Sequence, residues 1–158
     1  MDRVLFVLVY LAALGSAIVG GIFYGFSSFV MRALGRIPPE QGVAAMNSIN
    51  VVVINPSFMI VFMGTALVCL ALAASSIFWW QAGSSKLMLA AALLYFAGSL
   101  GLTMVVNQPM NLRLASLPPA QALAYWPEYL ESWIVWNHGR TAASLLASAL
   151  FVAALVLE

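Results

Sequence analysis

Charge is what this sequence has least of. Only 7% of its 158 residues are charged and 64% are apolar, whereas about a quarter of the residues of a soluble domain are charged. Six basic residues against five acidic ones leave neither a basic patch nor an acidic tail, so we expect no nucleic-acid partner. The composition predicts an integral membrane protein.

Cysteine and histidine are nearly as scarce. The single cysteine, Cys69, excludes an intramolecular disulfide and any CxxC redox motif, and its apolar surroundings predict an inert thiol. The single histidine, His138, with one distant thiol and no carboxylate inside a span, leaves too few ligands for a three- or four-ligand metal site, so we expect no metal. A haem held by His138 alone stays open, although no second axial ligand suggests itself.

Four long apolar runs stand out, and none shows the alternating polarity of a barrel strand. Because only helices or closed barrels satisfy the backbone in lipid, the runs predict four membrane-spanning helices. The first run is far longer than the roughly 7–15 apolar residues of a signal peptide, so we expect it to be retained. The predicted fold is an all-α, multi-pass, integral membrane four-helix bundle, a single domain over residues 1–158. Its spans are residues 4–31, 56–79, 87–106 and 133–157.

The connections between these spans differ in length. The turn residues Gly83, Ser84 and Ser85 make the connection from the second span to the third short, which predicts antiparallel neighbours. The other two connections, residues 32–55 and 107–132, are long, and the even number of spans puts both on one membrane face. That face carries more basic residues than the other, so the positive-inside rule favours cytoplasmic long connections and external termini.

Prolines and an asparagine mark the expected helix starts. Pro39 suits the first turn of a helix that continues over residues 41–53. Asn55 is a good N-cap for a helix beginning at Pro56. Pro127 is expected to open the last helix, which would run for about 30 residues, its first turns on the membrane surface and the rest across it.

Two glycine pairs predict close approach between helices. Gly21 and Gly25 form a small-xxx-small pair in the first span, which allows a neighbouring helix to come close. Gly98 and Gly101 form a similar but weaker pair in the third span. Packing is a simpler interpretation of both pairs than a specific dimer motif.

The last apolar run is too short to cross a membrane by itself. From Thr141 to Leu157 there are 17 uncharged residues, whereas a helix needs about 20 to cross the hydrocarbon layer. The span must therefore recruit Asn137, His138 and Arg140, and ionisable groups at that depth tend to face the bundle interior. Helical spacing puts His138 on the face next to that of Asn137 and Arg140. The residues predicted to share the latter face are Trp133, Asn137, Arg140 and Ser144, with Trp136 beside them.

The polar residues that are unusual in a membrane protein gather at one end of the predicted bundle. Every span contributes some of them, and parity puts them at the same depth. Such convergence is typical of a site between bundle helices with aromatic walls. The polar set is Ser27, Ser28, Asn47, Asn50, Asn55, Asn107, Asn111, Asn137, His138 and Arg140, and the aromatic set is Phe23, Tyr24, Phe26, Trp126, Tyr129, Trp133 and Trp136.

Each of these residues also has a simpler structural interpretation. Trp126 and Tyr129 would belong to an aromatic belt at the membrane interface, and Asn55 would be only a helix cap. Asn107 would satisfy carbonyl groups where the third span ends, and His138 would be a structural hydrogen-bond partner. The arginines that would be snorkelling or topogenic residues are Arg32, Arg36 and Arg113.

Short motifs follow one another along nearly the whole chain. They are Gly20-Gly21-x-Phe23-Tyr24-Gly25-Phe26 with Ser28, then Ala45-Met46-x-x-Ile49-Asn50 and Asn55-Pro56-x-Phe58, then Asn107-x-Pro109-x-Asn111, and last Trp133-x-x-Trp136-Asn137-His138-x-Arg140-Thr141. In this order they resemble the anthrone oxygenase-like family of small four-helix membrane proteins. Its best-studied members oxidise polycyclic anthrones to anthraquinones with molecular oxygen, without a metal or flavin. The resemblance implies a cofactor-free reaction and, for a bacterial-looking member such as this one, the bacterial inner (plasma) membrane.

On this resemblance, we expect an oxygenase or oxidoreductase that acts on a flat, lipophilic, phenolic substrate. Loss of an acidic C–H or phenol proton would give an electron-rich anion that reacts directly with oxygen. His138 would be the general base, because imidazole titrates near neutral pH, while Asn107, Asn111 and Arg140 would stabilise the anion. The substrate-binding residues would be Asn50, Asn55, Trp133, Trp136, Asn137 and Phe26.

A second class of function stays open. The chain would then be a non-catalytic membrane subunit whose polar cluster binds a lipid, a quinone or a partner membrane protein. A transporter is disfavoured, because no charged residue lies deep in a span and no internal repeat is evident. The expected partners are a lipophilic small molecule and membrane lipids, with a membrane-protein partner or a second copy of the chain as alternatives.

Overall fold

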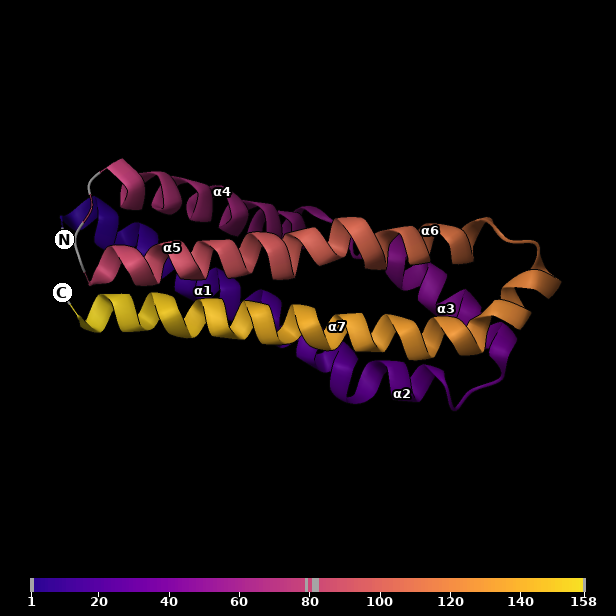
Figure 1. Cartoon of the computed structure of the whole chain (residues 1–158). Coiled ribbons are helices and arrows are strands. Elements are labelled where there is room, and N and C mark those ends of the chain that lie inside the picture. The colour runs from indigo at the N-terminus through magenta and orange to yellow at the C-terminus, as the bar shows by residue number, and fades with distance from the viewer. Residues whose placement is uncertain (1, 79, 81–82, 158) are drawn as a thin grey trace.

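The computed structural model describes residues 2–78, 80 and 83–157. Every regular element in these residues is a helix, which confirms the all-α prediction. Three short segments, labelled η, are π-helices, whose hydrogen bonds reach one residue further than those of an α-helix. The elements are α1 Arg3–Gly25, η1 Phe26–Val30, α2 Met31–Leu34, α3 Pro39–Val52, α4 Pro56–Phe78, α5 Ser84–Leu94, η2 Tyr95–Gly101, η3 Thr103–Asn107, α6 Gln108–Ser116 and α7 Pro119–Val156 (Figure 1).

Four long helical segments are apolar enough to cross a membrane, so the chain is an integral membrane four-helix bundle. They are Arg3–Leu34, Pro56–Phe78, Ser84–Ser116 and Pro119–Val156. Figure 1 shows them running along one another, with both termini at one end and the longer connections at the other. This is the arrangement that an even number of spans predicts.

The third and fourth segments continue beyond the predicted spans. The sequence predicts a long connection over residues 107–132, but the chain stays helical there except around Leu117 and Pro118. The physical reason is packing, because α6 and the first half of α7 contact each other and α3. The predicted end of the second span at Trp79 lies outside the described residues.

One predicted helix start is wrong and another is confirmed. Pro127 lies inside the continuous helix α7 and does not open it. Its ring is exposed, although a proline at this position leaves the carbonyl group of Leu123 without its usual N–H donor. Asn55 is the expected cap of α4, since its Oδ1 accepts a hydrogen bond from the Phe58 N–H at 3.0 Å.

Close helix contacts form at glycines other than the predicted pair of the first span. A methyl group added at Gly15 would overlap a side chain of α4, and one added at Gly98 would overlap a side chain of α7. A methyl group at Gly21 would meet nothing within 4 Å, and one at Gly25 would meet only a phenylalanine of the following turn. The prediction for the pair in the third span is confirmed at Gly98 only, because a methyl group at Gly101 would meet only the backbone of Phe96 in the same segment. The prediction at Gly21 and Gly25 is wrong because Gly21 lies on the exposed side of α1.

Two hydrophobic cores follow one another along the bundle. The first is formed by α1, α4, α5, η2 and α7 at the end that carries the termini. The second lies where α2, α3, α6 and the first half of α7 meet, and it contains Trp126 and Tyr129. Both aromatic side chains are buried, so their interpretation as an interfacial belt is wrong. They pack on each other with stacked rings 5.5 Å apart.

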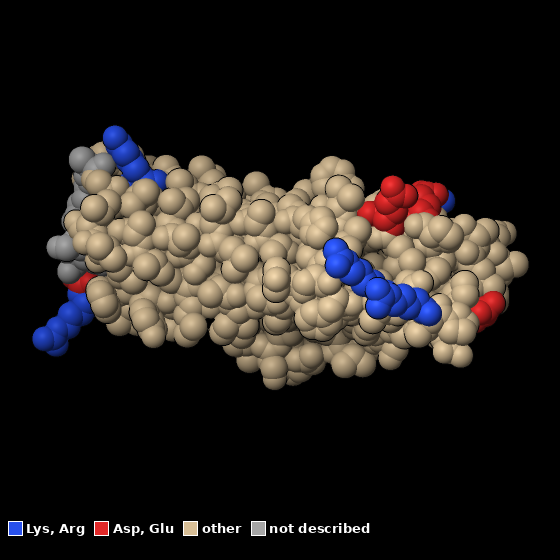
Figure 2. All heavy atoms as spheres, turned by 90° about the horizontal axis from the view of Figure 1, so that it is seen from below, with Lys and Arg blue, Asp and Glu red and all other residues tan. Residues whose placement is uncertain are grey.

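Charged side chains lie toward the two ends of the surface. Figure 2 shows a broad uncharged band between the charges near the termini and those on the other half of the molecule. All the charged residues that the structure describes are exposed except Arg140. Because the hydrocarbon layer excludes charge, this band is the surface that contacts membrane lipid.

Candidate functional site

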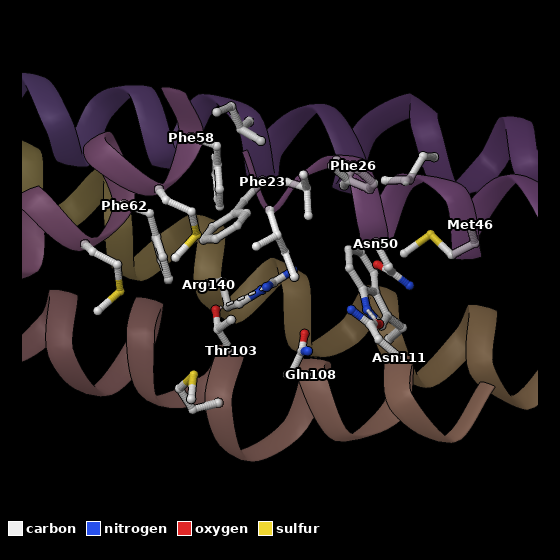
Figure 3. A pocket seen from close by; sticks show the side chains of 18 residues that line it. Phe23, Phe26, Met46, Asn50, Phe58, Phe62, Thr103, Gln108, Asn111 and Arg140 are labelled. Carbon is white, nitrogen blue, oxygen red and sulfur yellow. Dashed lines mark hydrogen bonds between the residues drawn. The ribbon is translucent and has the colours of Figure 1, made fainter. Parts of the chain in front are cut away.

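A cavity of about 250 Å³ lies where the two cores meet. Figure 3 shows Phe58 and Phe62 on one side of it, Thr103 and Gln108 on the other, and Arg140 between them. Its volume is slightly below the roughly 300–1,000 Å³ typical of small-molecule pockets. The lining residues are Ile22, Phe23, Phe26, Met46, Ile49, Asn50, Val53, Ile54, Phe58, Met59, Phe62, Met63, Thr103, Met104, Gln108, Asn111, Trp133 and Arg140.

Arg140 brings a positive charge into this largely apolar cavity. It is 5% exposed, and its Nη2 donates to Asn137 Oδ1 at 2.6 Å while its Nη1 donates to Thr103 Oγ1 at 3.2 Å. Its Nε is buried and has no acceptor. Among the described residues, no aspartate or glutamate lines the cavity. The charge of Arg140 therefore meets only neutral acceptors, and one of its donors has no acceptor among the described residues.

Aromatic rings surround the guanidinium group. Its central carbon lies 4.1 Å from the centroid of the Phe23 ring and 5.0 Å from that of the Trp133 ring. Cation–π attraction of this kind offsets part of the cost of burying the charge. Because the rings cover faces of the guanidinium, its N–H donors are the groups through which it can bind a ligand.

Asn137 holds Arg140 in place without lining the cavity. Its Nδ2 donates to the carbonyl oxygen of Phe23 at 2.7 Å and to Ser27 Oγ at 2.8 Å, and its Oδ1 accepts the bond from Arg140. The amide is fully buried and ties α7 to the junction of α1 and η1. Asn137 is therefore a positioning residue for the guanidinium.

The other end of the cavity is lined by amide groups. Asn111 Oδ1 accepts hydrogen bonds from Tyr129 Oη and from Trp133 Nε1, both at 2.8 Å. These bonds occupy the oxygen and leave the two N–H donors on the other side of the amide. Asn50 also lines the cavity, and its Nδ2 is buried with no acceptor. Donors without acceptors thus occur at both ends of the cavity.

Two π-helices shape the walls. Phe26 belongs to η1, and Thr103 and Met104 belong to η3, and all three line the cavity. A π turn inserts a residue into an α-helix and so changes which side chains face inward, and such turns occur frequently at functional sites. Part of the distortion of the first and third spans therefore lies at the cavity, although no residue of η2 lines it.

The site is a largely apolar, aromatic cavity that contains one buried cation, Arg140, and several side-chain amide groups. Within the described residues, no three His, Cys, Asp or Glu side chains come together. The sequence model of the anthrone oxygenase family matches residues 58–150, which is more than half of the chain. The chain belongs to the anthrone oxygenase family. No curated protein and no solved structure matches it.

The family match contains part of the cavity only. Arg140, Trp133 and Asn111 lie within residues 58–150, whereas Phe26 and Asn50 precede them. The motif resemblance before residue 58 therefore lies outside the matched range. In this member of the anthrone oxygenase family, α1 and α3 complete the walls of a cavity whose charged group comes from the matched segment.

The structure brings half of the predicted site residues together around the cavity. Asn50, Asn111, Arg140, Trp133 and Phe26 all line it. They come from α3, α6, α7 and η1, segments far apart in the sequence, so the expected convergence of several helices is found for these five. The predicted common face of α7 is also confirmed. Its members Trp133, Asn137, Arg140 and Ser144 are all buried.

Three predicted site residues lie next to the cavity without lining it. Asn137 positions Arg140 by accepting a hydrogen bond from its guanidinium group. Asn107 is buried, and its Nδ2 donates to the carbonyl oxygen of Trp133 at 3.2 Å, which ties η3 to the backbone of α7. Asn55 is the cap of α4, so the simpler of its two interpretations accounts for its contacts.

The expectation that His138 faces the same site as Arg140 is wrong. Both His138 and Trp136 are exposed and neither lines the cavity. The reason is helical rotation, because two residues of an α-helix turn the side chain by about 200°, so His138 points away when Arg140 points inward. Trp136 is turned outward in the same way, by about 100° from Asn137.

Several lining residues were not predicted from the sequence. Thr103 binds Arg140, and Gln108, Phe58 and Phe62 complete the walls. Helical spacing gave a usable signal for Thr103, which lies four and eight residues before Asn107 and Asn111. The η3 turn could not be inferred from the sequence, because a π turn depends on the packing around it.

Proposed function

We propose that this cavity binds a lipophilic anthrone-like phenol as its anion and that the protein oxidises the bound anion with molecular oxygen. The observation that carries the proposal is Arg140, a buried cation with an unused Nε donor in an aromatic cavity. A preorganised donor in a site of this kind stabilises negative charge that develops on a substrate oxygen. Membership of the anthrone oxygenase family supports the choice of substrate class.

The chemistry requires a stabilised carbanion and no group-transfer partner other than oxygen. An anthrone has a CH₂ group between two aromatic rings, and loss of one proton spreads negative charge onto its ketone oxygen. A cation beside that oxygen favours the charged form. The carbanion adds to O₂, the peroxide takes up a proton, and loss of water leaves a second ketone. The balance is R₂CH₂ + O₂ → R₂C=O + H₂O.

The proton is proposed to leave without a protein base. Among the described lining residues there is no His, Asp, Glu, Lys or Cys. Arg140 would instead make the bound substrate acidic enough to release its proton to water at the amide end of the cavity, where Gln108, Asn111 and Asn50 lie. Removing such a charge-stabilising donor from an active site typically costs about a hundredfold to a thousandfold in rate.

The experiment measures oxygen uptake and anthraquinone formation by the purified protein in lipid nanodiscs with anthrone as the probe. Arg140→Gln keeps hydrogen-bonding capacity but removes the charge, and we expect it to lower the rate about a hundredfold or more. Arg113→Gln is the matched control, because the Arg113 side chain is exposed and lies over the ring of Tyr125. We expect the control to keep its rate.

Each other outcome counts against part of the proposal. Equal rates for Arg140→Gln and the unsubstituted protein would remove Arg140 from the reaction. Tight binding of anthraquinone without oxygen uptake would reject catalysis and support the alternative of a non-catalytic subunit that binds an aromatic or quinone-like molecule. As the location of the reaction we propose the bacterial inner membrane, which is supported by four helical spans and by the family.

A further inference from the structure

The cavity reaches the lipid-facing surface of the bundle through its apolar wall. Met63 of α4 is 40% exposed and Met104 of η3 is 61% exposed, yet both line the cavity. A side chain that is open to the outside and also borders the cavity marks a passage between the two. Ile22 of α1, a third exposed apolar residue, borders the cavity as well.

The helices on the two sides of this passage are not packed tightly together. α4 packs on α5 and η2, but it makes few contacts with η3. The contact between α4 and the third span decreases along the π turns of that span, and these turns redirect the side chains that follow them. Figure 3 shows the result, with Phe58 and Phe62 of α4 facing Thr103 and Gln108 across the cavity.

The passage lies at the depth of the membrane and not in the charged end of the molecule. Met63 is seven residues after Pro56, the start of α4, which is about 10 Å along the helix axis. Both methionines belong to candidate membrane spans. Since the exposed side chains named at the passage, Met63, Met104 and Ile22, are apolar, it would be in contact with hydrocarbon and not with water.

We infer that the gap between α4 and η3, bordered by Met63 and Met104, is a lateral portal through which a lipophilic substrate passes from the bilayer into the cavity. The identity of the substrate rests on the proposed function, while the portal itself rests on the exposure and packing of these residues. Methionine suits a portal because its unbranched side chain changes conformation at little cost. The amide end beside Ile54 is the competing route, because Ile54 is also exposed and lines the cavity.

The test separates the route to the site from the site itself. Radiolabelled anthraquinone exchanges between protein in nanodiscs and an excess of liposomes, with empty nanodiscs as background. Met104→Trp places a bulky ring in the portal, and we expect the association and dissociation rates both to fall about tenfold or more while Kd changes less than about threefold. Met63→Trp closes the same portal from the facing helix and should act in the same way.

The matched control is Val105→Trp. Val105 is 75% exposed, follows Met104 directly in η3 and does not line the cavity, so exchange should stay unchanged. Exchange that is unaffected by both methionine substitutions, or slowed as much by Val105→Trp, would overturn the portal. Slower exchange only in Ile54→Trp would place the route at the amide end and overturn it too. A weaker Kd without slower exchange would make Met104 part of the binding site and would also reject the portal.

These outcomes are distinct from failure of the proposed function. If the unsubstituted protein binds no anthraquinone, the proposed substrate class is wrong and the inference falls with it. If it binds anthraquinone and oxidises anthrone but exchange is insensitive to both methionine substitutions, only the portal is wrong. Melting temperatures of all variants in detergent show whether each retains its fold.

Discussion

Arg140 shows how a charge can be kept in the interior of a membrane protein without a counterion. Burying a guanidinium costs several kcal/mol unless its donors and its charge are met. Here two neutral acceptors bind Nη1 and Nη2 and two aromatic rings contact the charged group. The buried Nε has no acceptor. A bound anion would complete the set, which is the role that the proposed function gives to Arg140.

Arg140→Lys tests whether the shape of the guanidinium matters as well as its charge. Lysine keeps the charge but lacks the planar fork that reaches Thr103 and Asn137 at the same time. Loss of one hydrogen bond to a charged group is worth about 1.5–3 kcal/mol, so we expect oxygen uptake with anthrone to fall about tenfold to a hundredfold. If the lysine variant keeps the rate and the melting temperature, Arg140 serves only as a positive charge.

His138→Gln tests the consequence of the outward orientation of His138. The side chain is exposed and lines no part of the cavity, and substitutions at such positions usually change stability by less than about 0.5 kcal/mol. We expect oxygen uptake within about twofold of the unsubstituted protein and an almost unchanged melting temperature. Loss of oxygen uptake with the fold intact would restore His138 as the base and would require it to reach a substrate from outside this cavity.

At the level of the elements, the helices near the cavity are irregular in two ways. The first and third spans contain π turns, and α7 contains Pro127. Each irregularity changes the direction of side chains without ending the helix. Two aromatic residues of the second core flank Pro127 along α7, because Trp126 directly precedes it and Tyr129 follows two residues later.

Pro127→Ala tests whether that proline stabilises the helix or only interrupts its hydrogen bonds. A proline inside a helix is about 3 kcal/mol less favourable than alanine, so we expect the alanine variant to melt at a higher temperature. Pro119→Ala is the control, because Pro119 occupies the first turn of α7, where the missing N–H costs nothing. A lower melting temperature for Pro127→Ala would mean that the proline is needed to direct Trp126 and Tyr129 into the core.

For the whole molecule, the order of packing along the bundle decides where a ligand can bind. The first core is close-packed between spans, and the second fills the end that projects beyond the uncharged band. The junction between the two cores contains the cavity. The site is therefore placed by the bundle as a whole and not by a single motif.

Gly98→Ala and Gly21→Ala test the close packing of the spans. A methyl group at Gly98 would overlap Ala143 of α7, and overpacking of this kind costs about 1–3 kcal/mol. At Gly21 there is open space, and alanine in a helix is about 0.5–1 kcal/mol more favourable than glycine. We expect the first variant to melt at a lower temperature than the unsubstituted protein and the second to melt at the same or a higher one. The opposite order would mean that the spans pack differently from Figure 1.

The sequence by itself determined the membrane class, the number of spans and part of the site. Composition decides the first two, because a chain with so little charge cannot be solvated as a soluble domain and lipid requires closed backbone hydrogen bonding. Helical period also determined the buried face of Trp133, Asn137, Arg140 and Ser144, since the spacing along one helix is a local property. The cap at Asn55 is local in the same sense.

Only the tertiary structure decided which polar residues meet. His138 and Arg140 are two residues apart in the sequence, and a rotation about the helix axis determines which of them faces the cavity. The π turns depend on packing between helices, so the η1 and η3 turns, which contain Phe26 and Thr103, could not be inferred locally. Whether a glycine such as Gly21 or Gly98 lies in a contact depends on where the neighbouring helix runs. Long-range packing decides these features, and it cannot be inferred from the sequence of a single helix.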